Sequence, residues 1–434
     1  MTSEKAHHVV IVGGGFAGLH TAMQLAKAPV QVTLVDRRNF HLFQPLLYQV
    51  ATGALSPANI ATPLRSVLKR QSNARVFLGD VVDVDPAGHR LILQDHEIKY
   101  DTLVMATGAH HQYFGHEEWS TTAPGLKTIE DATDIRHRVL RAFEAAEQET
   151  DPDRVLGLLT FVVVGGGPTG AELAGALCEI ARHTLRKEFR SIDPAKARVI
   201  LLDRAPRILP SYPEDLSAKA AATLRQLGVE VRTGVTVKNI DTEEVLIEAD
   251  GKDEHIRAHT VLWAAGVEAS HMGRILADKT GAELDAAERL IVEPDLTVPG
   301  YPEIFVIGDL AHTKGEDGRP LPGVAPVAIQ QGKYTARLIC RRLAGQAMAP
   351  FRYRNLGSMA TLGRSHAVVE MGKVHLSGLS AWLIWLFVHL MSLVQFQNRV
   401  LVLTQWAWNY LTWSRSARLI TGEVPPGFRH TTNE

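Results

Sequence analysis

The chain has 434 residues and a formal net charge of -1. This length allows two or three domains, and the near-neutral charge gives no sign of the basic field typical of nucleic-acid binding. Its two cysteines, Cys178 and Cys340, are too few for a disulfide framework or a cysteine metal site. We therefore expect no metal centre and a reducing compartment. The first apolar segment begins at Val9, which leaves no room for a signal peptide, so we expect a cytoplasmic location.

A glycine-rich turn follows this first apolar segment. Residues 9–12 read VVIV, and GGGFAG follows. In a dinucleotide fingerprint the first glycine, Gly13, makes the tight turn and the second, Gly15, lets the backbone approach a pyrophosphate. The third, Gly18, lets helix and strand pack closely. The pyrophosphate then lies on free N–H groups at the positive end of a helix, which we expect to run to about residue 28.

The same pattern occurs a second time. Residues 161–164 read FVVV, and GGGPTG follows with Gly165, Gly167 and Gly170 at the fingerprint positions. We expect a helix from about 169 to 189. One such motif alone can be a plain turn, but two of them, each after a β-branched run, indicate two bound dinucleotides and electron transfer between them.

An acidic residue ends the next expected strand of each unit, where it can accept hydrogen bonds from a ribose. The strand at 31–35 ends in Asp36, and the strand at 199–202 ends in Asp203. Asp203 lies further from its fingerprint than the usual spacing of about 20 residues, so it is the weaker of the two assignments. Either residue can instead be a helix or turn cap.

Three later apolar segments each end in a glycine signature. They read YDTLVMATG at 100–108, TVLWAAG at 260–266 and IFVIGD at 304–309. The last should return to the first unit, so that the second unit is inserted between two parts of the first. We therefore predict an α/β protein with two Rossmann-like domains.

The order GGGFAG, Asp36, ATG, GGGPTGAE, WAAG, IGD resembles the flavoprotein oxidoreductases with two dinucleotide-binding domains, which have a glutathione-reductase-like fold. Within them it is most similar to the type II NADH dehydrogenases, the non-proton-pumping NADH:quinone oxidoreductases. Residues 40–53, the glutamate of GGGPTGAE, and residues 261–267 and 325–332 carry this closer resemblance. It covers most of residues 7–345, together with the character of the tail.

The resemblance implies FAD at the first fingerprint and NADH at the second. The implied FAD-binding domain comprises residues 1–115 and 300–350, the NADH-binding domain 155–299, and a C-terminal membrane-associating region 351–434. A carboxylate at Asp203 accepts from a ribose 2′-OH and repels a 2′-phosphate, which favours NADH over NADPH. Arg204 and Arg207 lie nearby in the sequence and can soften that preference.

The resemblance also assigns cofactor contacts. Asp309 would hydrogen-bond the ribityl chain of FAD, although an aspartate after a strand can also be a plain turn residue. The remaining FAD contacts would be Gly13, Gly15, Gly18, Asp36, Ala106, Thr107 and Gly108. The NADH contacts would be Gly165, Gly167, Gly170, Asp203 and Gly266.

Three residues are candidates for a direct role in the reaction. Glu172 lies near the start of the second fingerprint helix, where the helix dipole favours a carboxylate by about 0.3–1 kcal/mol. The resemblance instead places it beside nicotinamide and flavin, where it would steady NADH or relay a proton. Gln330 and Gln331 would lie near a quinone headgroup, since an amide can donate to a quinone oxygen. Many relatives have glutamine where this chain has Pro326, which weakens that assignment, and both glutamines can instead be solvated.

Other functions stay open beside a quinone reductase. Dithiol flavoenzymes and sulfide:quinone oxidoreductases need paired or sulfur-carrying cysteines, whereas Cys178 and Cys340 are single and distant in sequence. Each is expected to behave as a small buried hydrophobe. The alternatives are another flavin-dependent reductase, of sulfide:quinone or ferredoxin type, and an NADH-sensing flavoprotein scaffold whose partner docks on the tail.

The tail is apolar and aromatic. Residues 379–394 would form a helix about 24 Å long, which is short for a hydrocarbon core of about 30 Å. Residues 400–413 contain Trp406, Trp408 and Trp413, which suit an interfacial helix. We expect peripheral attachment to a lipid bilayer surface, on the cytoplasmic face of the inner membrane. A buried helical hairpin, a homodimer contact and a spanning helix remain alternatives.

Overall fold

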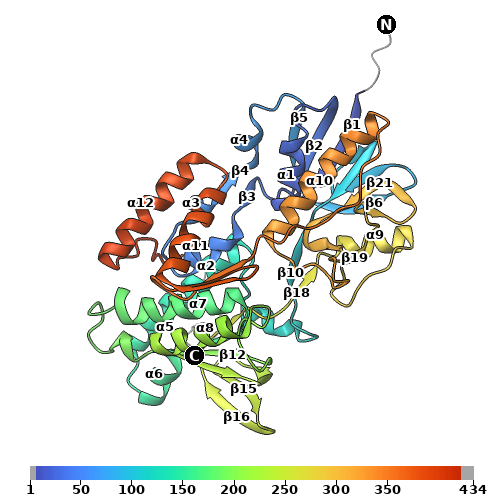
Figure 1. Ribbon diagram of the computed structural model, residues 1–434. Coiled ribbons are helices and arrows are strands. Elements are labelled where there is room, and N and C mark those ends of the chain that lie inside the picture. Colours follow the sequence, from blue (N-terminus) through green and yellow to red (C-terminus); the bar gives the residue numbers. More distant parts are fainter. Residues whose placement is uncertain (1–5, 422–434) are drawn as a thin grey trace. The chain divides into compact units, whose positions relative to one another are not determined.

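The computed structural model describes residues 6–421 of the chain. Its residues form two compact units, which interleave along the sequence (Figure 1). Unit 1 comprises Met1–Leu42, Ala61–His110 and Val267–Asn355, and unit 2 comprises Phe43–Ile60, His111–Gly266 and Leu356–Glu434. The chain thus resumes unit 1 at Val267 rather than near residue 300. The last part of the expected C-terminal region, 422–434, lies outside the described residues.

Unit 1 contains a six-stranded sheet of the order β20-β21-β9-β1-β2-β5. The pairs from β21 to β5 are parallel, and β20 is antiparallel to β21. The strands are β1 (His7–Val12), β2 (Val30–Asp36), β5 (Ala74–Leu78), β9 (Thr102–Met105), β20 (Thr297–Val298) and β21 (Tyr301–Val306). Its helices are α1 (Phe16–Gln24), α4 (Leu64–Leu68), α9 (Met272–Thr280) and α10 (Ala325–Leu343), with a 3₁₀ turn at Gly308–Leu310.

Small sheets complete unit 1. One pairs β3 (Phe40–Leu42) with β4 (Ala61–Pro63), and another joins β6 (Val81–Asp85), β7 (Arg90–Leu93) and β8 (Glu97–Lys99). Two more pair β10 (Ala109–His111) with β18 (Val267–Ala269) and β19 (Leu290–Ile291) with β22 (Ala311–His312). The β-branched residues of β1 are buried on both faces, as expected for a parallel strand covered by helices.

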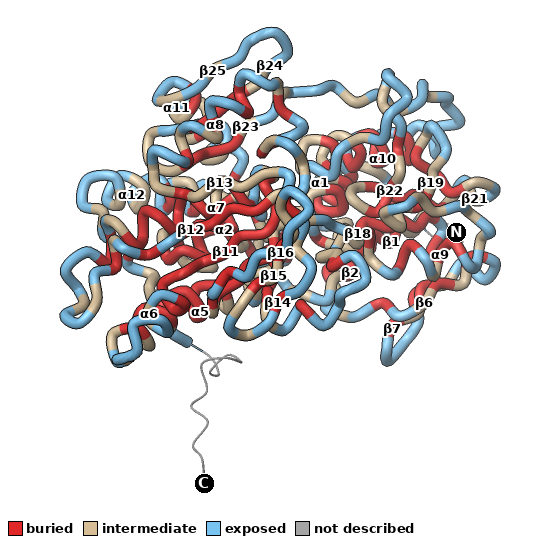
Figure 2. Tube along the Cα trace, turned by 90° about the horizontal axis from the view of Figure 1, so that it is seen from below, coloured by how far each residue is buried: buried red, intermediate tan, exposed pale blue. Residues whose placement is uncertain are grey.

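Unit 2 contains a four-stranded parallel sheet of the order β13-β12-β11-β17. Its strands are β11 (Thr160–Val164), β12 (Arg198–Asp203), β13 (Val229–Thr233) and β17 (Thr260–Trp263), and an antiparallel sheet joins β14 (Thr236–Ile240), β15 (Glu244–Ala249) and β16 (Lys252–Arg257). Its helices include α2 (Leu47–Ala51), α3 (Pro57–Ile60), α5 (Ile129–Gln148), α6 (Pro152–Leu158), α7 (Pro168–Glu179) and α8 (Glu214–Leu227), and 3₁₀ turns lie at Gln44–Leu46, Glu117–Thr121 and Pro194–Lys196. Figure 2 shows β11 buried in the centre of this unit.

Helix α7 is shorter than the sequence suggests. It ends at Glu179 and passes into a π-helical turn, Ile180–Thr184, in which the Leu185 N–H donates to the Ile180 carbonyl at 2.9 Å. The expected helix to residue 189 is therefore wrong in its second half. Such a widened turn often marks a functional position, and here it contacts the C-terminal segment, as described below.

The C-terminal part of unit 2 begins with an antiparallel sheet of β23 (Ser358–Thr361), β24 (Ala367–Met371) and β25 (Val374–Gly378). Two helices follow, α11 (Leu379–Ser392) and α12 (Phe396–Thr412). Figure 2 shows α12 exposed along much of its length, and its buried residues are Asn398 and Val402. Within residues 6–421, no helix combines the length and apolar character that crossing a bilayer requires.

Candidate active site

The first glycine turn, in unit 1, has the geometry of a dinucleotide cradle. Gly13 has φ +104°, and a Cβ there would overlap the Ala106 carbonyl. A Cβ at Gly18 would overlap the Gly13 carbonyl, so both positions require glycine. Gly15 caps the start of α1, and no heavy atom lies within 4 Å of a Cβ added to it. Open space therefore lies above the helix start, where a phosphate can approach the N–H groups.

The second glycine turn, in unit 2, repeats this geometry. Gly165 has φ +111° and lies against the backbone of Ala264. Gly170 packs on the Gly165 carbonyl, while Gly167 caps α7 and faces open space. In both turns the second fingerprint glycine, Gly15 or Gly167, therefore faces open space, whereas the first and third fingerprint glycines pack against backbone.

The two acidic residues occupy equivalent places. Asp36 accepts the Gly14 N–H at 2.5 Å and the Arg38 N–H at 2.7 Å, and burial raises its pKa. Asp203 accepts the Gly166 N–H through one oxygen and the Ala205 N–H at 2.6 Å through the other. Asp203 therefore takes the same position relative to its glycine turn as Asp36 does, despite the longer spacing in sequence.

The segments after the later strands contain the other residues that we predicted to contact cofactors. Gly108 has φ +71°, and its carbonyl accepts the Ser270 N–H at 3.0 Å, while the Thr107 and Ser270 hydroxyls lie 2.6 Å apart. Ala106 is buried directly before them. Asp309 is half-buried in the Gly308–Leu310 turn of unit 1. In unit 2, Gly266 is exposed with φ +75° at the end of β17.

The two predicted quinone-contacting glutamines already have protein partners. The side chain of Gln331 is 1% exposed, and its amide accepts the Gly308 N–H at 2.6 Å and donates to the Thr313 hydroxyl at 2.9 Å. The Gln330 amide exchanges two hydrogen bonds with the backbone of Arg354, at 2.9 and 3.0 Å. In this structure both side chains connect parts of unit 1, so their contact with a quinone stays a prediction.

A pocket rich in aromatic side chains lies within unit 2, and we call it the aromatic pocket. Helices α2, α7, α11 and α12 and the β23–β24 turn contribute its walls. Its lining residues are Tyr48, Gln49, Thr52, Ala54, Glu172, Ala176, Glu179, Thr361, Gly363, Arg364, Trp382, Trp385, Leu386, Trp406, Asn409, Tyr410, Trp413 and Arg415.

Helical spacing explains why these side chains share one cavity. Side chains three, four or seven positions apart project from the same face of a helix. Helix α7 therefore presents Glu172, Ala176 and Glu179 together, and α12 presents Trp406, Asn409 and Tyr410. Of the three tryptophans expected at a membrane, Trp408 is exposed, whereas Trp406 and Trp413 line the pocket. Trp406 and Trp413 are half-buried at the pocket wall, so their place at a membrane interface stays a prediction.

Glu172 is a titratable group of unusual properties in this pocket. It is half-buried, and its carboxyl accepts the Thr361 N–H at 3.3 Å. Desolvation by the surrounding protein raises its pKa to about 8, against the weaker opposing effect of that hydrogen bond. The carboxyl is therefore largely protonated at neutral pH and can act as an acid.

A second carboxylate, Glu179, joins three segments at the pocket wall. One oxygen accepts the Arg364 N–H, and the other pairs with Arg415 at 2.7 Å. Arg415 also donates to the Thr52 carbonyl at 3.1 Å. The Arg364 guanidinium lies 3.9 Å from the ring centre of Tyr410 and 4.1 Å from that of Trp413. Glu179 thus connects α7 with the β23–β24 turn and with the chain after α12.

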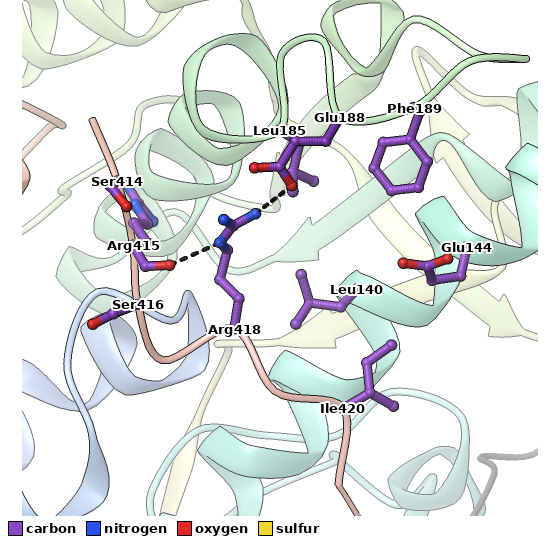
Figure 3. A pocket seen from close by; sticks show the side chains of 10 residues that line it. All are labelled: Leu140, Glu144, Leu185, Glu188, Phe189, Ser414, Arg415, Ser416, Arg418 and Ile420. Carbon is purple, nitrogen blue, oxygen red and sulfur yellow. Dashed lines mark hydrogen bonds and ion pairs between the residues drawn. The ribbon is translucent and has the colours of Figure 1, made fainter. Parts of the chain in front are cut away.

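The π-helical turn after α7 holds the same C-terminal segment. The His183 ring stacks on Trp413 with centroids 4.1 Å apart, and the Thr184 hydroxyl donates to the Trp413 carbonyl at 3.2 Å. A second, more polar hollow lies beyond this segment (Figure 3). There the Arg418 side chain extends to Glu188, with which it forms an ion pair at 2.6 Å.

The sequence interpretation missed most of the aromatic pocket. Tyr48, Gln49, Glu179 and Arg364 carried no predicted role. Arg415 was expected beside the aromatic residues of an interfacial helix, but it is buried and paired with Glu179. The recurrence of aromatic residues three and four positions apart in the tail was a usable signal for an inward face. Among residues 6–421, no group of three or more His, Cys, Asp or Glu is placed to hold a metal ion.

Comparison with known proteins agrees with this architecture. Residues 7–332 match the family described as pyridine nucleotide-disulphide oxidoreductase, and residues 355–415 match the NDH2 C-terminal domain. The type II NADH:quinone oxidoreductase Ndh of Mycobacterium tuberculosis is 46% identical over 427 residues, 96% of this chain and 91% of that protein. The type II NADH:quinone oxidoreductase of Staphylococcus aureus is 30% identical over 370 residues, 84% of this chain and 89% of that protein.

Solved structures share the fold. The NDH2 of Plasmodium falciparum in complex with NADH has a TM-score of 0.87 at 18% identity, over 96% of this chain and 100% of that one. The sulfide:quinone oxidoreductase of Aquifex aeolicus has a TM-score of 0.71 at 18% identity, over 95% and 93% of the two chains. The family matches and the identity to the curated relatives together carry the assignment: the chain belongs to the type II NADH:quinone oxidoreductases and is an oxidoreductase.

Proposed function

We propose that the chain binds FAD in unit 1 and NADH in unit 2. The open space above Gly15 and Gly167, at the starts of two helices, fits two pyrophosphates. Asp36 and Asp203 would each accept from a ribose hydroxyl, and Asp309 from the ribityl chain of FAD. Ala106, Thr107 and Gly108 would line the FAD path, and Gly266 the NADH site. Held by these residues, FAD would supply the chemistry of hydride acceptance from NADH and of two-electron transfer to the quinone.

The aromatic pocket is our candidate for the quinone site. The observation that carries this proposal is the Glu172 carboxyl, which is set among aromatic side chains and has a pKa near 8. Reduction of a quinone by NADH also consumes one proton from solution, and a carboxyl that is protonated at neutral pH can deliver it. The rings of Trp382, Trp385 and Trp406 offer flat apolar surface for a quinone ring.

A sulfur-carrying activity receives no support from the two cysteines. Cys178 is buried in α7, and burial raises the pKa of its thiol to about 12. The reactive thiolate form is therefore scarce at neutral pH. Burial also raises the pKa of Cys340 on α10. These properties favour a reductase that uses no cysteine over the sulfide:quinone alternative.

The outer faces of α11 and α12 are our candidate for attachment to a bilayer surface. Leu383 and Phe387 of α11 are 53% and 63% exposed, and Phe396 and Leu411 of α12 are 77% and 78% exposed. These residues lie on the helices whose inner faces line the aromatic pocket. Exposed apolar patches of this kind mark membrane or protein contacts. We propose a peripheral position on the cytoplasmic membrane face, with a homodimer contact as the competing use of this surface.

The decisive experiment is a cofactor and turnover measurement on purified protein. We expect a flavin spectrum with one FAD per chain, because one fingerprint is followed by the ATG and IGD segments. We also expect steady-state NADH oxidation with a soluble short-chain quinone. A colourless protein that takes up no flavin would overturn the FAD assignment, and a protein that binds NADH without turnover would support the scaffold alternative.

A further inference from the structure

A chain of hydrogen bonds runs from α12 to α2 at the wall of the aromatic pocket. The indole Nε1 of Trp406 donates to the Gln49 carbonyl oxygen at 2.7 Å. The Gln49 amide nitrogen then donates to the Tyr48 hydroxyl oxygen at 2.9 Å. Tyr48 and Gln49 are 7% and 8% exposed, so these two side chains have little contact with bulk water.

The indole of Trp406 determines which group donates and which accepts in each of these hydrogen bonds. An indole N–H can only donate, so Gln49 must present its carbonyl oxygen to Trp406. The amide nitrogen then faces Tyr48, and the Tyr48 oxygen must accept. The hydroxyl proton of Tyr48 is consequently directed away from Gln49. Within residues 6–421, the Tyr48 hydroxyl donates to no protein acceptor, although it lines the pocket.

We propose that the Tyr48 hydroxyl donates a hydrogen bond to a carbonyl oxygen of the quinone, and that Trp406, acting through Gln49, is a positioning residue that keeps this proton pointed into the pocket. The inference rests on the proposed function of the aromatic pocket. It adds a hydrogen-bond donor that holds the quinone, distinct from the acid Glu172.

The charged neighbours of Tyr48 are compatible with this role. Burial, and then the nearby Glu172, raise the pKa of Tyr48 well above its usual value, so the hydroxyl keeps its proton throughout the physiological range. Glu179 and Arg415 also act on it, in opposite directions. Because Glu172 is itself largely uncharged at neutral pH, it is not the strong acceptor that an ionised carboxylate would be.

The test compares three variants in one assay. Tyr48→Phe removes the donor and keeps the ring. Gln49→Glu offers Tyr48 an acceptor oxygen instead of an amide N–H, so the hydroxyl proton turns away from the pocket. Trp406→Phe removes the indole N–H and releases the Gln49 amide to rotate. Tyr301→Phe, on β21 of unit 1, is the control for loss of a tyrosine hydroxyl elsewhere.

We expect each of the three variants to raise the KM for a short-chain quinone, with Tyr48→Phe raising it about fivefold to tenfold, the usual value of one hydrogen bond. The rate of flavin reduction by NADH and the flavin content should stay near those of the wild type. The melting temperature should also stay unchanged in Tyr48→Phe and Trp406→Phe, whereas Gln49→Glu should lower it because it buries a carboxyl. Tyr301→Phe should change none of these quantities.

A double-mutant cycle separates positioning from packing. If Trp406 and Gln49 act only through the Tyr48 proton, then Tyr48→Phe/Trp406→Phe and Tyr48→Phe/Gln49→Glu raise the KM no further than Tyr48→Phe alone. Effects that multiply would overturn the positioning role, and an unchanged KM in Tyr48→Phe would overturn the donor role. A wild-type enzyme that reduces no quinone would instead refute the proposed function. If Gln49→Glu or Trp406→Phe fails to fold, Tyr48→Phe still decides the donor role, and the other single variant still tests positioning.

Discussion

The Glu179 carboxylate and the Arg415 guanidinium form an ion pair at 2.7 Å, with their side chains 11% and 9% exposed. Arg415 lies on the segment after α12, and Glu179 is the last residue of α7. Taking both charges out of water is costly, so the pair is poor evidence for a large net stabilisation. Its geometry instead determines how the C-terminal segment lies against α7.

Removal of one partner of this ion pair should therefore lower the free energy of unfolding substantially. We expect Glu179→Ala to lower the free energy of unfolding by about 3–5 kcal/mol, because it leaves a buried guanidinium without its counter-charge. Chemical denaturation followed by tryptophan fluorescence measures this loss. The control is Glu188→Ala, which breaks the more exposed pair with Arg418 and should cost less than about 1 kcal/mol. Equal losses in the two variants would contradict the special role of Glu179.

The acid role of Glu172 predicts a pH dependence. Its pKa is raised to about 8, so the protonated acid is lost as the pH rises through 8. We expect kcat/KM for quinone to fall above about pH 8 in the wild type, and this fall to be absent in Glu172→Gln, which should be slower at neutral pH. A profile from pH 6 to 10 tests this. An identical alkaline decline in the variant would exclude Glu172 as its source.

The same ionisation affects stability. The folded pKa of Glu172 lies above the unfolded value of about 4.5, so the folded chain holds a proton that the unfolded chain loses first. The contribution of Glu172 to stability is then fully present below pH 4.5 and decreases as the pH rises to about 8. Melting temperatures of wild type and Glu172→Gln, compared at pH 5 and pH 8, should therefore diverge, with the wild type losing more.

Asp203 should set the preference for NADH. Its carboxylate lies over the second glycine turn, where it would repel the 2′-phosphate of NADPH. We expect Asp203→Asn to narrow the NADH-to-NADPH ratio of kcat/KM by roughly tenfold. Asp36→Asn is the matched variant in the first glycine turn and should lower FAD retention without changing this ratio. A wild-type enzyme that prefers NADPH would refute the ribose assignment.

The exposed apolar residues of α11 and α12 should hold the protein on membranes. Moving one large apolar side chain from water into an apolar environment is favourable by about 1.5–3 kcal/mol. Replacing such a side chain by a polar one removes this contribution to membrane binding. We expect Phe387→Ser/Phe396→Ser/Leu411→Ser to release the protein from lipid vesicles in co-sedimentation. Activity toward a long-tailed quinone should fall more than activity toward a short one. Retained sedimentation together with loss of a dimer in light scattering would identify this surface as a dimer contact.

Local patterns in the sequence predicted the core of the fold. The order of strand, glycine turn and helix depends on neighbouring residues only, and it is confirmed at β1 and α1 and at β11 and α7. The end of α7 was not predictable in this way. The π-helical turn contacts Trp413 through Thr184 across 229 positions, and no local preference encodes such a partner.

The aromatic pocket was beyond sequence reasoning for the same physical reason. Trp406 and Trp408 are two positions apart on one helix and have similar chemistry, yet one bonds Gln49 and the other is 61% exposed. Which face of α12 turns inward depends on α2, more than 350 positions earlier. Hydrophobicity alone therefore predicts the same environment for all the tail tryptophans, whereas their tertiary contacts give them different environments.

Helix α7 has twelve residues and is about 18 Å long. It begins directly after Gly167 of the second glycine turn, and it carries Glu172 near its start and Glu179 at its end. The nucleotide turn and one wall of the aromatic pocket thus share a single helix, and we expect a compound that displaces the pocket face of α7 to displace its first turn as well. Resistance substitutions selected against such a compound should therefore come with altered nucleotide affinity, which limits the routes by which this enzyme can escape inhibition.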